Sequence, residues 1–210
     1  MTTQVKICGL STLEAVDVAI DAGATHIGLN LYEPSPRYVP LERAKQLADH
    51  ARGQIKTVLL LVNADAVTTS QALTEVRPDA VQFHGSETPE WVGLVREKVG
   101  IETWKAVGLS DKGTLERSLK FKGKVDRLLF DAPAKALPGG NGETFAWDLL
   151  SGHQHQIDWA LAGGLTPENV AQAIQQTGAT MVDTSSGVEN ASGVKDMDLI
   201  RAFCEAALSV

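Results

Sequence analysis

Eight short apolar segments, separated by helix-like sequence, constrain the fold of this chain more than any other feature. They recur at intervals of roughly 25 residues. Most are nearly continuous apolar runs rather than alternating ones, which is typical of parallel strands covered on both faces. The predicted strands are Val5–Cys8, His26–Leu31, Lys56–Val62, Ala80–Phe83, Glu102–Val107, Arg127–Asp131, Asp158–Ala162 and Met181–Asp183.

The alternation of strand and helix predicts parallel strands joined by right-handed crossovers, and therefore either a closed barrel or an open doubly wound sheet. A dinucleotide-binding sheet carries the pattern G-x-G-x-x-G after its first strand. This chain has Cys8-Gly9-Leu10-Ser11 at that place, which counts against the open sheet. We therefore predict an α/β fold, a (β/α)8 TIM barrel, that forms a single domain over residues 1–210.

Local sequence also predicts where helices begin and where the chain is irregular. Thr88-Pro89 and Thr166-Pro167 each place a capping threonine before a proline at the first helical position. The stretch 132–144 is rich in Pro, Gly, Ala and Asn and follows the sixth predicted strand. Its length and position predict a mobile loop beside an active site.

Composition disfavours several classes of partner. The formal net charge is −7 and there is no long basic run, which counts against binding to nucleic acid or to an acidic membrane surface. No apolar run approaches the ~18 residues of a membrane span. The N-terminal residues do not form a secretory signal, so we expect a cytoplasmic protein whose Cys8 and Cys204 remain reduced.

Two small, glycine-bearing turns follow the last two predicted strands. Gly163-Gly164 follows the seventh, Ser185-Ser186-Gly187 follows the eighth, and helix-like sequence resumes after both. Such turns leave backbone N–H groups free to face an anion, and the next helix adds the positive end of its dipole. Two turns of this kind at the end of a βα repeat are the usual phosphate site of such a barrel. We therefore expect the substrate to be a phosphorylated small molecule.

Reactive side chains at the predicted strand ends indicate acid–base chemistry, because catalysis in a barrel takes place where the carboxyl ends of its strands meet. Cys8 ends the first strand, and its thiolate can act as a base or a nucleophile. Asp131 ends the sixth after an apolar run, which favours a general acid. A base and an acid on opposite sides of one small substrate suit isomerisation by proton transfer, for which no cofactor is required.

Other polar positions leave alternatives open. The planar guanidinium of Arg37 suits a carboxylate or a phosphate, but the residue could equally form a surface ion pair. His84 follows the fourth predicted strand, where we favour a turn residue over a catalytic one. His153 and His155 have no further ligand group beside them, so no metal site is expected. Whether Lys6 reaches the mouth of the barrel is left open.

Seven motifs occur in an order that resembles one enzyme family, phosphoribosylanthranilate isomerase of tryptophan biosynthesis. They are VKICGL (5–10), SPRYV (35–39), VQFHG (81–85), FDA (130–132), GGNGETFAWDLL (139–150), LAGGLTPENV (161–170) and VDTSSGVE (182–189). The resemblance extends from Val5 to about Asp196. It implies a cofactor-free (β/α)8 barrel that converts N-(5-phosphoribosyl)anthranilate to 1-(2-carboxyphenylamino)-1-deoxyribulose 5-phosphate, as a monomer or a homodimer. One departure is Asn30, where many relatives have an aromatic residue.

The resemblance also implies roles for individual residues. Asp131 corresponds to the general acid, Cys8 to the general base, and Arg37 to the residue that pairs with the anthranilate carboxylate. Asp183 matches an acidic position beside the substrate amine. The residues that would hold the phosphate are Gly163, Gly164, Ser185, Ser186 and Gly187.

Two rival interpretations share the phosphate turns. One is another sugar-phosphate barrel: a histidine-pathway isomerase would need an aspartate where Cys8 stands, and a pentulose-phosphate epimerase would need metal-binding histidines at several strand ends. The other is a non-catalytic barrel that only binds phosphorylated metabolites or a protein partner. The presence of both Cys8 and Asp131 argues against that barrel.

Overall fold

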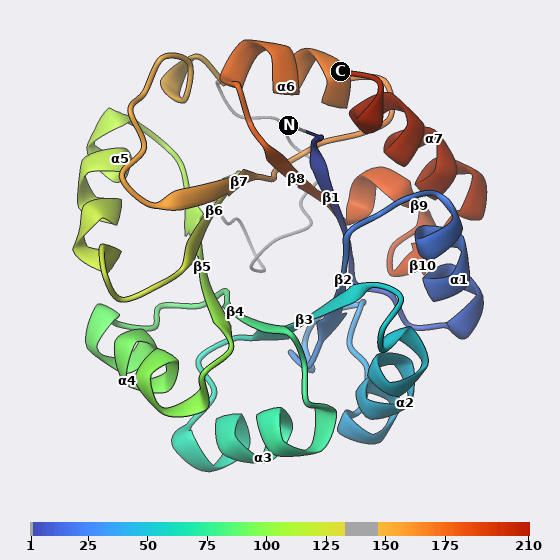
Figure 1. Ribbon diagram of the computed structural model, residues 1–210, viewed down its shortest axis with the longest axis vertical. Coiled ribbons are helices and arrows are strands. Elements are labelled where there is room, and N and C mark those ends of the chain that lie inside the picture. The colour runs from blue at the N-terminus through green and yellow to red at the C-terminus, as the bar shows by residue number, and fades with distance from the viewer. Residues whose placement is uncertain (1, 133–146) are drawn as a thin grey trace.

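The computed structural model describes residues 2–132 and 147–210, which form a closed barrel of eight parallel strands in sequential order. Figure 1 shows the strands as an inner ring with the helices outside it. The predicted barrel is therefore confirmed, and the open sheet is excluded. The strands are β1 (Gln4–Cys8), β2 (His26–Asn30), β3 (Lys56–Leu61), β4 (Ala80–Phe83), β5 (Glu102–Gly108), β6 (Arg127–Asp131), β7 (Asp158–Leu161) and β8 (Met181–Thr184).

The strand predictions are accurate because the signal is the burial of both faces. No predicted strand end differs from the observed end by more than one residue. One apolar cluster fills the space between strands and helices. A second cluster lies inside the barrel and includes Val58, Trp104, Leu129 and Met181. Most strands thus bury side chains on both sides, which explains the nearly continuous apolar runs in the sequence.

The strand register determines which residues meet inside the barrel. The ring closes where β1 pairs with β8, and Lys6 lies opposite Asp183 in that ladder. On the other side of β1, Cys8 lies opposite Gly28 of β2. A Cβ atom on Gly28 would stand 2.7 Å from the sulfur of Cys8, so this position must remain a glycine for the thiol to keep its place.

The helices of the described residues surround the barrel (Figure 1). None of them is long and apolar enough to cross a lipid bilayer. A short antiparallel hairpin, β9 (Glu189–Ala191) and β10 (Val194–Lys195), is inserted after β8. The helices are α1 (Leu13–Asp21), α2 (Leu41–Ala51), α3 (Ala66–Val76), α4 (Pro89–Val99), α5 (Lys112–Ser118), α6 (Val170–Thr177) and α7 (Met197–Leu208), with 3-10 turns η1 (Leu119–Phe121), η2 (Trp147–Leu149) and η3 (Ser186–Val188).

One of the two predicted helix starts is correct. Thr88 caps α4 by accepting a hydrogen bond from the amide of Trp91, and Pro89 is the first helical residue. The start predicted at Thr166-Pro167 is wrong, because α6 begins at Val170. The intervening residues form a turn that the side chain of Asn169 closes: it accepts from the amide of Thr166 (2.8 Å) and donates to the carbonyl of Gly164 (2.9 Å).

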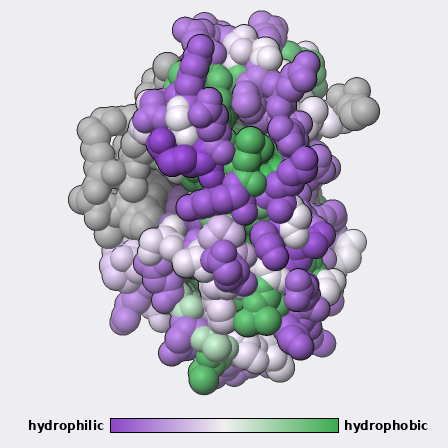
Figure 2. All heavy atoms as spheres, turned by 90° about the vertical axis from the view of Figure 1, so that its left-hand side faces the viewer, coloured by the Kyte–Doolittle hydropathy of each residue, from purple (hydrophilic) through white to green (hydrophobic). Residues whose placement is uncertain are grey.

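The predicted mobile loop at 132–144 falls almost wholly on residues 133–146, which lie outside the described residues. It stays a prediction. On the face of the molecule that carries α4 and α5, hydrophilic side chains dominate and hydrophobic ones form small separate patches (Figure 2). This pattern is typical of a surface without a large apolar patch.

Candidate active site

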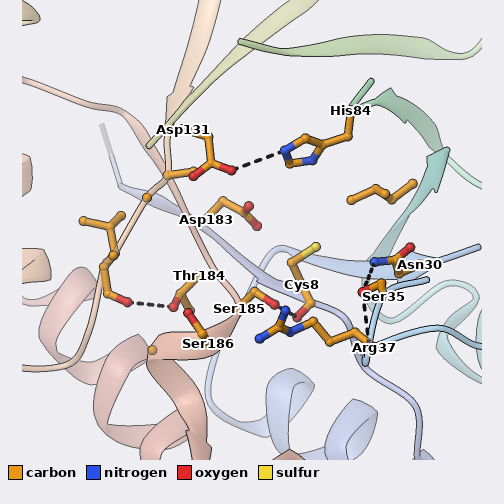
Figure 3. Close-up of a pocket in the computed structure, with 16 residues that line it drawn as sticks. Cys8, Asn30, Ser35, Arg37, His84, Asp131, Asp183, Thr184, Ser185 and Ser186 are labelled. Atoms are coloured by element: carbon orange, nitrogen blue, oxygen red, sulfur yellow. Dashed lines mark hydrogen bonds and ion pairs between the residues drawn. The ribbon is translucent and has the colours of Figure 1, made fainter. Parts of the chain in front are cut away.

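A pocket opens at the carboxyl ends of the strands. Figure 3 shows how side chains from opposite sides of the barrel converge on it. All nine residues predicted from the sequence as catalytic or substrate-binding line this one pocket. They are Cys8, Arg37, Asp131, Gly163, Gly164, Asp183, Ser185, Ser186 and Gly187.

The two residues predicted to exchange protons both reach this pocket. Cys8 is the last residue of β1 and Asp131 is the last residue of β6. Their side chains approach the cavity from different sides in Figure 3, and both residues are largely buried. The amide of Ala132 donates a hydrogen bond to the Asp131 carboxylate (2.8 Å), which helps to orient it. The geometry therefore allows one small molecule to contact the thiol and the carboxyl group together.

His84 contributes more to the site than the sequence indicated. Its Nε2 lies 3.3 Å from Oδ2 of Asp131, and its Nδ1 lies 2.9 Å from Nε2 of Gln82 (Figure 3). A Gln82 amide that donates to Nδ1 leaves the ring proton on Nε2, where it faces Asp131. The available signal was the position of His84 directly after β4, at the mouth of the barrel.

The turn that follows His84 is held by a buried ion pair. Glu87 accepts hydrogen bonds from the amides of Gly85 (2.9 Å) and Asn63 (2.7 Å). Lys105, itself buried, lies 3.2 Å from the Glu87 carboxylate and donates to the carbonyl of Gly85 (2.7 Å). These contacts restrict the backbone next to His84 and thereby help to fix the position of its imidazole beside Asp131.

Lys6, whose place the sequence analysis left open, is not among the residues that line the pocket but contacts one of them, Asp183. Its side chain is fully buried and its Nζ lies 2.7 Å from Oδ1 of Asp183. Lys6 and Cys8 are two residues apart on one strand, so their side chains share the inner face of the barrel. This alternation was readable in the sequence, but the pairing with Asp183 depends on the register between β1 and β8.

Burial and neighbouring charges set the ionisation of this group. Burial raises the pKa of the Cys8 thiol, while the ammonium of Lys6, which also hydrogen-bonds to the thiol, limits that rise. Burial by itself would lower the pKa of Lys6, but the Asp183 carboxylate and Cys8 raise it, so Lys6 remains a cation. Burial likewise raises the pKa of Asp183 against the opposing effect of Lys6.

Arg37 lies in the pocket but is not a surface residue. Its Nε and Nη2 donate to the two carboxylate oxygens of Glu189, at 2.8 and 2.7 Å. The side chains of this ion pair are only 11% and 4% exposed. Asn30 stabilises the loop that carries Arg37, because its Nδ2 donates to Oγ of Ser35 (3.1 Å), which in turn accepts from the amide of Arg37 (3.2 Å; Figure 3).

The two glycine-bearing turns lie together on one side of the pocket. Gly163 and Gly164 have positive φ angles of 84° and 65°, and no hydrogen bond joins their amide N–H groups to any described residue. Thr184 donates from Oγ1 to the carbonyl of Leu165 (2.8 Å), which packs the second turn against the first. Backbone N–H groups arranged in this way suit an anion such as phosphate.

The sequence placed a helix after each of these turns, and the structure differs after the second. Ser185 is followed by the single 3-10 turn η3 and by the β9–β10 hairpin before α7 begins at Met197. A helix of one turn has few aligned peptide dipoles. Any anion binding at Ser185–Gly187 therefore depends on local N–H groups rather than on the dipole of a long helix.

Replacing Gly187 by alanine is expected to weaken the binding of inorganic phosphate by about 10-fold, because charge-assisted hydrogen bonds are lost when the turn moves. A Cβ atom at Gly187 would overlap the carbonyl oxygen of Leu165, so the backbone must shift. Titration calorimetry measures the effect. Gly53→Ala is the control: Gly53 has a φ of 79° and does not line the pocket, and a Cβ atom there would meet nothing within 4 Å. Unchanged affinity in Gly187→Ala would remove this turn from the phosphate site.

The remaining candidates lie away from the pocket. His155 stacks on Trp159 at 4.2 Å, and burial together with the neighbouring His153 lowers its pKa to about 4. Cys8 and Cys204 are both free, and burial raises the pKa of Cys204 to about 12. These features indicate packing roles for His155 and Cys204.

Comparison with known proteins identifies the family of this chain. Residues 5–206 match the family described as N-(5'phosphoribosyl)anthranilate (PRA) isomerase. The N-(5'-phosphoribosyl)anthranilate isomerase of Erythrobacter litoralis (strain HTCC2594) is 58% identical over 205 residues, 98% of this chain and 98% of the relative. The crystal structure of phosphoribosyl anthranilate isomerase from Thermotoga maritima superposes with a TM-score of 0.90 at 32% identity, covering 99% of this chain and 100% of that one.

Two further crystal structures, each 32% identical with a TM-score of 0.87 over 99% of this chain and 100% of theirs, are informative. One is a phosphoribosyl anthranilate isomerase in complex with reduced 1-(o-carboxyphenylamino)-1-deoxyribulose 5-phosphate. The other shows monomers generated from the dimeric Thermotoga maritima enzyme. Family match, sequence identity over nearly the whole chain and shared fold agree. This chain belongs to the N-(5'-phosphoribosyl)anthranilate isomerase family.

Proposed function

We propose that this enzyme carries out the Amadori rearrangement of N-(5-phosphoribosyl)anthranilate, a step of tryptophan biosynthesis, with Asp131 as the general acid and Cys8 as the general base. The observation that carries these roles is that the thiol, the carboxyl group and both glycine-bearing turns line a single pocket. A phosphate held at the turns places the attached sugar between the two reactive groups. Binding both ends of the substrate in this way orients the reacting carbons.

Asp131 starts the reaction by giving its proton to the ring oxygen of the ribose. The C1–O bond then breaks, and the lone pair of the anthranilate nitrogen forms a C=N bond, so that the product of this step is a protonated Schiff base. His84, at 3.3 Å from Asp131, stabilises the carboxylate that remains after the proton has left. Asp183 lines the same pocket, and we place it near the substrate amine.

Cys8 completes the reaction by removing the proton from C2, next to the imine carbon. The electrons of the C–H bond move toward the nitrogen, and the resulting enolamine tautomerises to the ketone. Because burial raises the pKa of Cys8, the resting thiol needs positive charge nearby to ionise. Lys6 supplies one such charge, and the cationic Schiff base supplies a second one at the moment when the base is needed.

Arg37 is placed to recognise the anthranilate carboxylate, while the backbone around Gly163-Gly164 and Ser185-Ser186-Gly187 binds the phosphate. These assignments rest on the shared pocket and on the resemblance of the motifs. Among the described residues, no three His, Cys, Asp or Glu side chains are grouped to hold a metal ion. A cytoplasmic location and a monomeric or homodimeric state remain predictions from the sequence.

A fluorescence assay tests the proposed reaction. Freshly prepared N-(5-phosphoribosyl)anthranilate should lose its anthranilate-type fluorescence when the enzyme is added, and the product should be the carboxyphenylamino-deoxyribulose phosphate by mass and chromatography. Tight binding of the product analogue without turnover would instead support a non-catalytic phosphometabolite-binding barrel.

Replacing Lys6 by methionine is expected to move the ionisation of Cys8 to higher pH, because the loss of a nearby cation destabilises the thiolate relative to the thiol. The rate of Cys8 alkylation by iodoacetamide, followed against pH in a Cys204→Ala background, measures this shift. The charges of Asp183, Lys195 and Arg37 also interact with Cys8, and these three residues are the same in the variant and the wild type.

The double variant Lys6→Met/Asp183→Asn is the control for the aspartate that Lys6→Met leaves unpaired. Its alkylation profile should also move to higher pH, since the effect of Lys6 on Cys8 exceeds that of Asp183. A profile that stays in place or moves to lower pH in both variants would contradict the role of Lys6.

A further inference from the structure

A buried cluster of three charged side chains includes Arg37 of the pocket and two residues, Glu189 and Lys195, that the mechanism above does not use. Arg37 comes from the loop after β2, whereas Glu189 and Lys195 come from the β9–β10 hairpin. Glu189 accepts hydrogen bonds from Nε and Nη2 of Arg37, one from Nζ of Lys195 (2.8 Å) and one from the amide of Gly193 (3.1 Å). We call these three side chains the Arg37–Glu189–Lys195 cluster.

Burial of these three charges costs desolvation free energy. The side chains of Glu189 and Lys195 are only 4% and 2% exposed. Burial by itself would raise the pKa of Glu189, but the hydrogen bonds from Arg37 and Lys195 lower it to about 2. Buried ion pairs add little net stability compared with apolar residues of similar size, because desolvation of the charges offsets their attraction. A role in holding Arg37 accounts for the cluster better than stability does.

Lys195 links the cluster to the second glycine-bearing turn. Its Nζ donates to the carbonyl of Ser185 (2.8 Å) and lies 3.3 Å from the Ser185 hydroxyl. That hydroxyl donates to the carbonyl of Cys8 (3.1 Å). One lysine therefore connects Glu189, the turn at Ser185 and, through Ser185, the backbone of the predicted base.

The hairpin also touches the loop of Arg37 through backbone atoms. Gly193, with a φ of 80°, packs so closely on Pro36 that a Cβ atom would overlap the Pro36 carbonyl oxygen. On the other side, a Cβ atom at Gly9 would stand 3.0 Å from Cβ and Cγ of Arg37. Arg37 is thus confined between the β1 turn, the hairpin and the carboxylate of Glu189, and little of its rotamer freedom is left to lose on binding.

We propose that Glu189 and Lys195 are positioning residues that hold the two anion-binding ends of the substrate site at a set separation. Glu189 orients the Arg37 guanidinium for the aromatic carboxylate, and Lys195 holds the Ser185 turn for the phosphate. The proposal rests on the proposed function, since it needs a substrate with an anionic group at each end.

The test compares two ligands that differ only in the aromatic carboxylate. They are reduced 1-(o-carboxyphenylamino)-1-deoxyribulose 5-phosphate and the same compound without its carboxyl group. Glu189→Gln is close to isosteric, so the fold is retained while the charge that aligns Arg37 is removed. We expect the affinity for the carboxylated ligand to fall by about 10-fold and that for the other ligand to change by less than about 2-fold, because only the former uses Arg37.

A double-mutant cycle shows whether Glu189 acts through Arg37. In an Arg37→Met background, Glu189→Gln should have no further effect on carboxylate preference, because coupled residues are not additive. With N-(5-phosphoribosyl)anthranilate, Glu189→Gln should raise KM by about 10-fold and lower kcat by less than about 3-fold. A merely structural role would weaken the binding of both ligands equally and would change kcat and KM without this split.

Lys195→Met tests the other end of the cluster. The substitution should lower the affinity for inorganic phosphate by about 10-fold, because the Ser185 turn moves when Lys195 no longer holds it. Lys56→Met is the matched control: Lys56 also pairs with a glutamate, Glu102, but it lies exposed at the opposite end of the barrel, on the first residue of β3. Its phosphate affinity should equal that of the wild type.

The outcomes separate this proposal from the proposed function. A wild-type chain without isomerase turnover contradicts the proposed function. If the wild type turns over substrate and Glu189→Gln leaves the carboxylate preference unchanged, the role proposed for Glu189 is wrong. If Lys195→Met leaves the phosphate affinity unchanged, the role proposed for Lys195 is wrong. If Lys195→Met does not fold, Lys195→Gln, which is shorter and polar, is measured in its place with the same expected direction.

Discussion

Replacing Cys8 by serine is expected to lower kcat by about 10³-fold, the loss typical of removing a general base. The hydroxyl of serine ionises far less readily than a thiol, so the variant has almost no base in the correct state. The change in size is small and the pocket is otherwise intact. The affinity for the reduced product analogue should therefore change by less than about 3-fold, since binding does not use the proton acceptor. The fluorescence assay measures kcat, and calorimetry measures affinity.

Cys204→Ser is the matched control for this experiment. Cys204 lies in α7 and is completely buried in the apolar layer outside the barrel. Its replacement affects stability more than chemistry, so kcat should stay near the wild-type value below the melting temperature. A Cys8→Ser enzyme with nearly normal kcat would show that another group accepts the proton.

Replacing Asp131 by asparagine is expected to lower kcat by about 10²- to 10⁴-fold, because the amide has no proton to give to the ring oxygen. The shape is retained, and the amide oxygen can still accept the hydrogen bond from Ala132 that orients the native carboxylate. Binding of the product analogue should persist. Ring opening would become the slow step, so rapid-mixing experiments should show no accumulation of Schiff base.

Asp158→Asn serves as the control for Asp131. Asp158 is exposed and begins β7, so it lies at the opposite end of the barrel from the pocket. Its kcat should match that of the wild type. An Asp131→Asn variant with normal kcat would move the acid role to another group, and His84 would be the first to examine because it contacts Asp131.

The boundaries of the strands were predictable, whereas those of one helix were not. A strand covered on both faces leaves a continuous apolar run, which is a local signal. The start of α6 depends instead on Asn169, which reaches back to Thr166 and Gly164 and closes a turn ahead of the helix. By local rules alone, the threonine–proline pair at 166–167 is a plausible helix start. The hydrogen bonds of Asn169 to Thr166 and Gly164 instead form a turn there, and the helix begins later.

The candidate site divides in the same way. Cys8, Asp131 and the glycine turns could be identified because each lies at a strand end, and in a parallel barrel all such ends meet at one mouth. The contact between His84 and Asp131 joins the residue after β4 to the last residue of β6, and these two strands are not neighbours. No local pattern distinguishes such a histidine from a turn residue.

The amino-acid sequence alone determined the kind of barrel and the strands, and it supplied the candidates for proton exchange, since each of these depends on local composition and on the order of elements. Tertiary structure decided the electrical surroundings of those residues. Lys6 meets Asp183 only when β1 closes the ring against β8, and Arg37 meets Glu189 only when the hairpin after β8 folds back on the loop after β2. These partners lie 177 and 152 residues apart in the chain. Their attraction becomes strong only when both are buried together, and burial is a property of the closed barrel rather than of any segment in it.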